Sequence, residues 1–433
     1  MKRKRPNGRV ARKRRRKRNS QLQSVSVCHQ ASYVRLMRFL NRKGFASTIL
    51  QPAHFSDTGR GLKTLKTIKP GHLLIHLPQS CLLTTTTVLN SYLGPLIKSW
   101  RSRPSPLLVL CVFLVLERHR SPFSEWYPYI DVLPATYTCP VYFADDVIEL
   151  LPSLVQRQAL EQRTLVQELH ASNQPFFKWL QPLVVEPVEE VFTFEALRWA
   201  WCTVNTRSVF MPHAPCQFLS GQDVCALAPF LDLLNHRPDV QVLANFNSAT
   251  GGYEIKSISG IGCYQQAFIN YGSHDNQRLL LEYGFIAANN PHSVVYVDTD
   301  LICKVLHKDN SLHQKIKFLK QNEFLCNLTV SSEGPGWRLM AALRVLSLPQ
   351  TQFGLWKAVL LGQCLSEEQE RWCVQTIRSL CVQILQDTDR ALEKISHLLQ
   401  LRDESLNEQL DIVLALRQEE KSILGKCLEI IIL

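Results

Sequence analysis

The sequence Ala228-Pro229-Phe230-Leu231-Asp232-Leu233-Leu234-Asn235-His236 is followed, some thirty residues later, by Ile269-Asn270-Tyr271-Gly272 and then by Glu282-Tyr283-Gly284-Phe285. In the first stretch an apolar run ends at Asn235 and His236, two side chains that can hydrogen-bond a polar ligand. The second stretch places a phenol beside a glycine, where backbone can pass close to a bound molecule. Taken singly, each stretch is also typical of ordinary structure, a capped core segment or a turn, so the order of the stretches is the informative feature.

A third segment lies upstream of these stretches, at Asp57-Thr58-Gly59-Arg60-Gly61-Leu62. It is followed by Ile68-Lys69-Pro70-Gly71-His72 and by Leu73-Leu74-Ile75-His76-Leu77-Pro78, a mostly apolar stretch that ends in a proline. By themselves these residues predict a hairpin: a Gly-flanked turn, a strand, a Pro-Gly turn and a second strand.

In this order the three segments resemble the SET-domain protein methyltransferases, over roughly residues 48–290. The resemblance implies S-adenosyl-L-methionine as the cofactor and a lysine side chain of a protein as the methyl acceptor. It implies that Tyr271 is the catalytic residue, with its hydroxyl directed at the amine and the methyl group, and that Tyr283 lines the lysine channel. The cofactor-binding residues that it implies are Arg60, His72, Leu74, Arg207, Asp232, Asn235, His236 and Phe285.

The resemblance also assigns a role to several of these residues. His72 and Leu74 are expected to contact the cofactor through the backbone, although the family often has Glu where this chain has His72. Asn235 and His236 are expected at its amino and adenine ends, with Asp232 ordering that segment. The ring of Phe285 is expected to lie against the adenine.

Arg207 ends the segment Trp199-Ala200-Trp201-Cys202-Thr203-Val204-Asn205-Thr206-Arg207. The pattern of this segment predicts a buried helix that carries two indole side chains. In the related enzymes an arginine at this place faces the methionyl carboxylate of the cofactor. A guanidinium group suits that role because its donors form a fixed planar fork.

The distribution of strand and helix patterns predicts an α+β chain with three parts. We expect a catalytic domain at 28–300, strand-rich at 48–104 and 222–290, with a helical insertion at about 105–221. This division resembles the split-SET group of the Rubisco large-subunit methyltransferase, whose SET fold has short curled β-sheets. Residues 301–433 are predicted to form an all-α domain, which in that group binds the protein substrate. The leucine spacing of 388–424 primarily indicates core, with a coiled-coil dimer seam as the alternative.

Twelve lysines and arginines lie within residues 1–18, without an acidic residue among them. The remaining 37 basic residues balance the 37 acidic residues, so the net charge of +12 belongs to this segment. Because it has almost nothing apolar to bury, we expect residues 1–27 to form a disordered tail. The tail suits a nuclear import signal, an arm that contacts nucleic acid through phosphates, or a solvated terminus. We expect the protein in the nucleus and the cytoplasm.

The 14 cysteines lack the spacing of zinc sites, so we expect no metal. The start of the chain has no apolar signal segment, and residues 107–116 form its longest apolar run. That run is about half of the roughly 20 residues that a spanning helix needs, so we expect no membrane partner and an intracellular protein.

The function that we expect is S-adenosylmethionine-dependent protein-lysine N-methylation of histone tails and of other nuclear or cytosolic proteins. Two alternatives stay open at this point. One is protein-histidine methylation, because a split-SET relative modifies actin in that way. The other is a catalytically inactive chromatin-binding adaptor that retains the fold.

Overall fold

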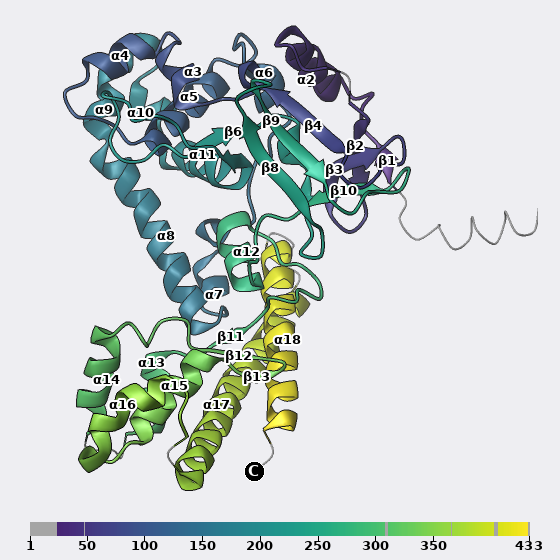
Figure 1. The fold of residues 1–433 in the computed structure, drawn as a ribbon. Helices are drawn as coiled ribbons and strands as arrows, with labels where there is room; N and C mark the ends of the chain where they lie inside the picture. The colour runs from purple at the N-terminus through teal and green to yellow at the C-terminus, as the bar shows by residue number, and fades with distance from the viewer. Residues whose placement is uncertain (1–23, 47, 308–310, 365, 402–405, 432–433) are drawn as a thin grey trace, which may run out of the picture. The chain divides into compact units, whose positions relative to one another are not determined.

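The computed structural model describes residues 24–46, 48–307, 311–364, 366–401 and 406–431 (Figure 1). The chain divides into two compact units. The first unit contains residues 1–136 and 166–272, and the second contains residues 137–165 and 273–433. This division differs from the domain boundary at residue 301 that we expected, because residues 137–165 and 273–300 belong to the second unit.

The main sheet of the first unit has five strands in the order β1-β2-β3-β10-β7. Its pairs are antiparallel except for β10 and β7, which run parallel, with Phe268 opposite Asn235 and Ile269 opposite His236. This sheet therefore brings together segments that are about 200 residues apart in the chain. The strand bounds are β1 Val25–Ser26, β2 Leu50–Phe55, β3 Gly59–Thr64, β7 Asn235–His236 and β10 Gln266–Ile269.

A second sheet has the order β4-β9-β8, and a third pairs β5 with β6. The hairpin predicted for residues 57–78 is therefore wrong: its first strand is β3, in the main sheet, and its second strand is β4, in another sheet. The strand β3 pairs with β2 and with the distant β10, and β4 pairs with the distant β9, so the two strands do not pair with each other. The bounds are β4 Leu73–Pro78, β5 Ser208–Phe210, β6 Cys225–Leu227, β8 Val242–Asn247 and β9 Gly252–Ser257.

Helices of the first unit cluster around α5 (Pro106–His119), whose residues are buried from Leu108 to Glu117. The helix α5 packs against α11 (Phe194–Arg207). Two short helices, α3 and α4, lie within residues 48–104, so the strand-rich character expected there ends at Pro78. The other helices are α2 Ala31–Arg42, α3 Thr85–Leu89, α4 Gly94–Ser99, α6 Tyr127–Ile130, α9 Gln174–Trp179 and α10 Val188–Val191, with the 3-10 helices η1 Gln79–Cys81, η3 Gln181–Leu183 and η4 Leu231–Leu233.

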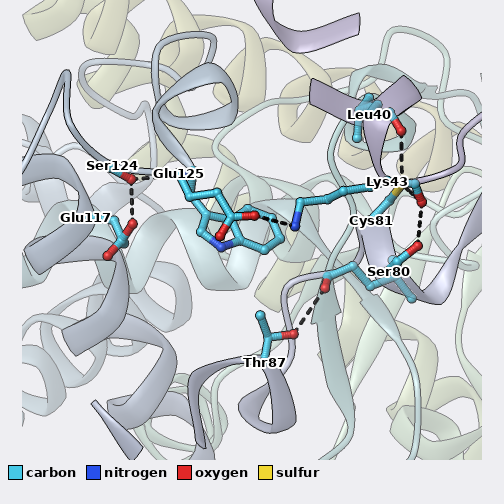
Figure 2. Close-up of polar contacts among 10 residues, drawn as sticks. Leu40, Lys43, Ser80, Cys81, Thr87, Glu117, Ser124 and Glu125 are labelled. Carbon is cyan, nitrogen blue, oxygen red and sulfur yellow. Dashed lines mark hydrogen bonds and ion pairs between the residues drawn. The ribbon is translucent and has the colours of Figure 1, made fainter. Parts of the chain in front are cut away.

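Figure 2 shows how the end of α2 is held in the first unit. The Lys43 ammonium lies 2.7 Å from a carboxylate oxygen of Glu125, while the Lys43 carbonyl accepts a 2.5 Å hydrogen bond from Ser80. The thiol of Cys81 lies 3.8 Å from the carbonyl oxygen of Leu40. These contacts connect the helix to the segment that follows β4 and to the residues after α5.

The second unit has two apolar cores. One is built from the helices α13 to α18 and the sheet β11-β12-β13, and the other joins α7, α8 and α12 to α17 and α18. The bounds are α7 Asp145–Ile148, α8 Ser153–Ser172, α12 Asn276–Tyr283, β11 Val295–Tyr296, α13 Thr299–Val305, α14 Leu312–Gln321, β12 Thr329–Ser331, β13 Gly334–Pro335, α15 Trp337–Ser347, α16 Trp356–Leu360, α17 Glu367–Gln400 and α18 Asn407–Ile430, with η2 Pro140–Tyr142 and η5 Gln350–Leu355.

The leucine-rich stretch 388–424 is divided between two helices, because α17 runs on to Gln400 before α18 begins at Asn407. No glycine or proline interrupts residues 367–400, so the backbone hydrogen bonds continue. The two helices pack against each other (Figure 1), and the leucine-rich spacing serves the core of the chain itself.

The disordered tail expected for residues 1–27 is wrong at its end, since β1 pairs with β2 at Val25 and Ser26. The basic residues of the tail lie outside the described residues. The α+β class is confirmed. Along the described ranges, each helix is too short or too polar to span a membrane.

Candidate active site

Asn235 connects β7 to the start of β3. Its side-chain Nδ2 donates a hydrogen bond of 2.9 Å to the carbonyl of Arg60 and one of 3.4 Å to the carbonyl of Thr58. The Arg60 side chain in turn donates to the carbonyl of Val132 at 2.5 Å. The Gly-flanked turn and the Asn-His pair, which are separate motifs in the sequence, thus meet in the main sheet.

The absence of a side chain at Gly61 lets the amides of Gln266 and Asn235 lie close to the backbone of β3. A Cβ atom at Gly61 would lie 2.7 Å from Nε2 of Gln266 and 3.1 Å from Nδ2 of Asn235. The Gln266 Oε1 accepts a hydrogen bond from Thr58 Oγ1 at 2.9 Å, but its buried Nε2 has no hydrogen-bond partner among the residues that the structure describes. A buried donor without a partner costs about 1–3 kcal/mol, so the turn is suited to a polar ligand.

Asp232 lies in η4, between two groups from other elements. Arg207, the last residue of α11, donates from Nη1 to the Asp232 carbonyl at 3.0 Å, and the Tyr129 hydroxyl donates to the Asp232 carboxyl at 3.0 Å. Desolvation raises the pKa of this carboxyl from 3.8 to about 6, against the opposing effects of Arg207, Tyr129 and Arg60. Both arginines therefore add positive charge beside the Asn-His segment.

His236 and Tyr271 are joined at the ends of the parallel strands β7 and β10. The buried His236 accepts at Nδ1 a 3.0 Å hydrogen bond from the backbone N–H of Tyr271, and the ring centroids are 5.2 Å apart. A neutral His236 ring therefore carries its proton on Nε2. The parallel pairing of the two strands brings these residues together.

The Tyr271 hydroxyl donates to the carbonyl of Leu234 at 2.6 Å. A phenol that donates its one proton keeps its oxygen lone pairs as acceptors. Tyr271 is half-buried and follows β10, and its hydrogen bond to Leu234 holds the phenol oxygen in position.

His72, which precedes β4, and Leu74, which lies in β4, differ in backbone pairing. His72 uses both backbone groups, since its N–H donates to Lys69 and its carbonyl accepts from Ser257. At Leu74 the register between β4 and β9 shifts, so this residue has no partner in β9. Such bulges leave backbone groups unpaired, as the backbone role expected for Leu74 requires.

Tyr283 and Phe285 belong to the second unit, so the structure describes the site in two parts. Their ring centroids are 6.3 Å apart, and burial raises the pKa of the Tyr283 phenol. Gly284 between them is left-handed, with φ of 77°, and a Cβ there would lie 2.7 Å from the backbone of Cys139. The glycine thus fixes the path of the chain between the two aromatic rings.

In the first unit the structure brings together Arg60, Arg207, Asp232, Asn235, His236 and Tyr271 through these contacts. Sequence reasoning missed Tyr129, Gln266 and the Leu234 carbonyl. Gln266 could have been noticed as a polar residue within a strand pattern. Tyr129 gave no such signal, because it stands among other aromatic residues. Within the described part of the chain, no three His, Cys, Asp or Glu side chains are grouped as for a metal ion.

Residues 307–424 match the family model described as Rubisco LSMT substrate-binding. The chain is 47% identical to SET domain-containing protein 4 of Mus musculus, over 97% of this chain and 96% of the relative. It is 44% identical to the Homo sapiens protein of that name, over 96% of each. It is also 28% identical to the actin-histidine N-methyltransferase of Homo sapiens, over 60% of this chain and 43% of that protein.

The fold is similar to that of a crystal structure of the SET domain of LSMT bound to lysine and AdoHcy. The TM-score is 0.64 at 19% sequence identity, with 93% of this chain and 91% of that chain covered. The predicted SET fold and the resemblance to the Rubisco LSMT group are confirmed. With nearly half of its residues identical over almost its whole length, the chain belongs to the SET domain-containing protein 4 family of SET-domain methyltransferases.

Proposed function

We propose that this chain is an S-adenosylmethionine-dependent protein-lysine N-methyltransferase that acts on histone tails and on other nuclear or cytosolic proteins. The observation that carries the proposal is the fixed phenol of Tyr271, beside the Asn235-His236 segment. Methyl transfer to an amine is an in-line displacement, so the main task of the protein is to align the reacting groups and exclude water.

The residues of the first unit fit the cofactor of SET-domain methyltransferases, S-adenosylmethionine, and this chain uses that cofactor. When bound, it supplies a methyl group on a cationic sulfonium. Arg207 has a guanidinium suited to the methionyl carboxylate, and Asn235 and the bulge at Leu74 offer polar groups. The buried amide of Gln266, which lies close to Gly61, supports the same assignment.

Tyr271 positions the acceptor amine. Because its proton is given to Leu234, its oxygen can accept an amine N–H and polarised C–H groups. The acceptor lysine must arrive neutral, although its ordinary pKa is about 10.4. Desolvation and a nearby cation both lower that pKa, so an aromatic channel beside a sulfonium favours the neutral amine. We assign the half-buried Tyr283 to this channel and Phe285 to the adenine of the cofactor.

Lysine as the acceptor is supported by the solved structures of similar fold, in which LSMT is bound to lysine or to monomethyllysine. Histidine is the second candidate, because the human relative at 28% identity is an actin-histidine N-methyltransferase. The relatives called SET domain-containing protein 4 are more similar to this chain, but their name does not specify the residue that accepts the methyl group. The methylated product must therefore be identified directly.

The deciding experiment incubates the full chain with nuclear extract and tritiated S-adenosylmethionine, hydrolyses the labelled protein and separates methyllysine from methylhistidine. Label in methyllysine, mapped to histone or other nuclear peptides, supports the proposal. Label in methylhistidine overturns lysine as the acceptor. If calorimetry detects no binding of S-adenosylmethionine to the full chain, the inactive adaptor is favoured instead.

A further inference from the structure

Two hollows in the second unit share part of their lining, and together they are called the groove. The first, of about 580 Å³, is lined by residues of α8 and α12, and the second, of about 410 Å³, reaches α13 and α17. Both are lined by Leu154, Gln277, Tyr296 and Asp298. A ligand that crosses these shared residues would occupy both hollows.

Gln277 lies in the first turn of α12, where the two hollows meet. Its residue is only 7% exposed, and its side-chain amide has no hydrogen-bond partner among the described residues. Gln277 lines both hollows, so its amide can donate to and accept from a ligand there. The main chain of an extended peptide offers both an acceptor and a donor.

The walls around Gln277 are held by internal hydrogen bonds. Asp275 caps α12 by accepting from the N–H of Arg278 at 2.9 Å, and it accepts from the Tyr296 hydroxyl at 2.8 Å. Desolvation and the charge of Asp275 raise the pKa of Tyr296, which keeps the phenol as a donor. On the other side the buried Arg417 and Glu420 pair at 2.8 Å. The groove is therefore formed before a ligand binds, which lowers the cost of binding.

The first hollow carries an excess of negative charge. Its lining has two arginines against four carboxylates, whereas the second hollow has three groups of each sign. Arg278 lies 2.9 Å from Glu282, and Arg157 lies 3.7 Å from Asp298. Glu161 is exposed on α8 and has no ion pair within the described ranges. A cationic side chain in this hollow could therefore pair with Glu161, which forms no ion pair with another described residue.

We infer that this groove binds an extended basic segment of the protein substrate, with its main chain at Gln277 and a lysine or arginine side chain near Glu161. The inference rests on the protein-methylating function proposed above and identifies a second place at which the substrate is held. Sites for small organic ligands are lined mostly by apolar and aromatic side chains. The polar and charged lining here favours a peptide.

The test uses the full chain and a synthetic peptide library in which a central lysine is kept and each flanking position is fixed in turn. Tritiated S-adenosylmethionine reports transfer, and kcat and KM are measured separately. The variants are Gln277→Leu, which keeps the size and removes the amide, and Glu161→Arg, which reverses an exposed charge. The controls are Gln314→Leu on α14 and Glu168→Arg on α8, two exposed residues outside the lining of the groove.

The wild type should prefer lysine or arginine at one or more flanking positions. Glu161→Arg should lose this preference, and Gln277→Leu should raise KM about tenfold at nearly unchanged kcat, since one hydrogen-bonded contact with a buried group is lost. Both controls should behave as wild type. If both variants keep the KM and the flanking preference of the wild type, the groove does not bind the peptide, while the methyltransferase function stays intact. A wild type that binds cofactor and methylates none of the peptides would overturn both.

Discussion

The hydroxyl of Tyr271 donates its proton to the carbonyl of Leu234, across a distance of 2.6 Å. Leu234 immediately precedes the Asn235-His236 strand, and His236 accepts the backbone N–H of Tyr271 at 3.0 Å. Two hydrogen bonds therefore fix the backbone and the phenol of Tyr271 relative to the same short segment. This arrangement positions the phenol oxygen before any substrate arrives.

Replacing Tyr271 by Phe should keep cofactor affinity and lower methyl transfer about a hundredfold or more, because a preorganised polar contact at the reacting centre is lost. Calorimetry with S-adenosylmethionine and a tritium-transfer assay measure the two properties. Tyr264→Phe is the matched control, since Tyr264 is 69% exposed. Full turnover by a folded Tyr271→Phe variant would place the catalytic role in another residue.

Replacing Gly61 by Ala should weaken binding of S-adenosylmethionine by about tenfold, which corresponds to about 1.4 kcal/mol. The new methyl group would meet Gln266 at 2.7 Å and Asn235 at 3.1 Å, so that these amides must move. Calorimetry gives the affinity. Gly425→Ala is the control, because a Cβ at Gly425 meets no atom within 4 Å. If both variants bind the cofactor equally well, the turn does not face it.

The buried carboxyl of Asp232 should make stability depend on pH. Its pKa is about 6 in the fold, against an ordinary value of 3.8. Because the folded value is the higher one, the stabilising contribution of the protonated carboxyl is complete below pH 3.8 and is lost as the pH rises through about 6. Replacement by Asn removes this titration and keeps an oxygen that can accept from Tyr129.

Urea unfolding at several pH values between about 4 and 7 tests this expectation. The free energy of unfolding of the wild type should fall relative to that of Asp232→Asn as the pH rises. The exposed Asp411→Asn should follow the wild type at every pH. Parallel curves for the wild type and Asp232→Asn would show that Asp232 titrates alike in the folded and unfolded chains.

Deleting residues 1–18 should move the protein from the nucleus to the cytoplasm and leave activity on a short peptide nearly unchanged. The reason is that all of the net charge of +12 lies in this segment. A full-length variant with glutamine at its twelve basic positions controls for chain length and should behave like the deletion. Fluorescence microscopy of tagged chains measures the distribution.

A truncated protein that stays nuclear and binds DNA more weakly would contradict the import signal. In that case the segment acts as a nucleic-acid arm. Each lost phosphate contact should then lower the slope of the salt dependence of duplex binding by about 0.9.

Much of the first part of the site was predictable from short stretches of sequence. Asn235, His236 and Tyr271 stand in motifs whose order alone indicates the family, and Arg207 ends a helix that its own apolar pattern predicts. The left-handed conformation of Gly284 could also be predicted locally, since glycine commonly ends a helix in this conformation. These features depend on residues that are neighbours in the chain, so they can be recognised before the fold is known.

The tertiary structure alone decided which distant segments meet. Residues 59–64 and 73–78 predict strands, and residues 59–64 pair locally with β2. Their other partners, β10 and β9, come from about 180 to 200 residues further along the chain. The support that Tyr129 gives to Asp232 and the contact of Gln266 with Thr58 depend on such pairings. Local propensity specifies that a strand or helix forms, whereas burial and hydrogen bonding between remote segments select its partner. The sequence by itself therefore determined the chemistry of the site, and packing decided the neighbours that hold each group in place.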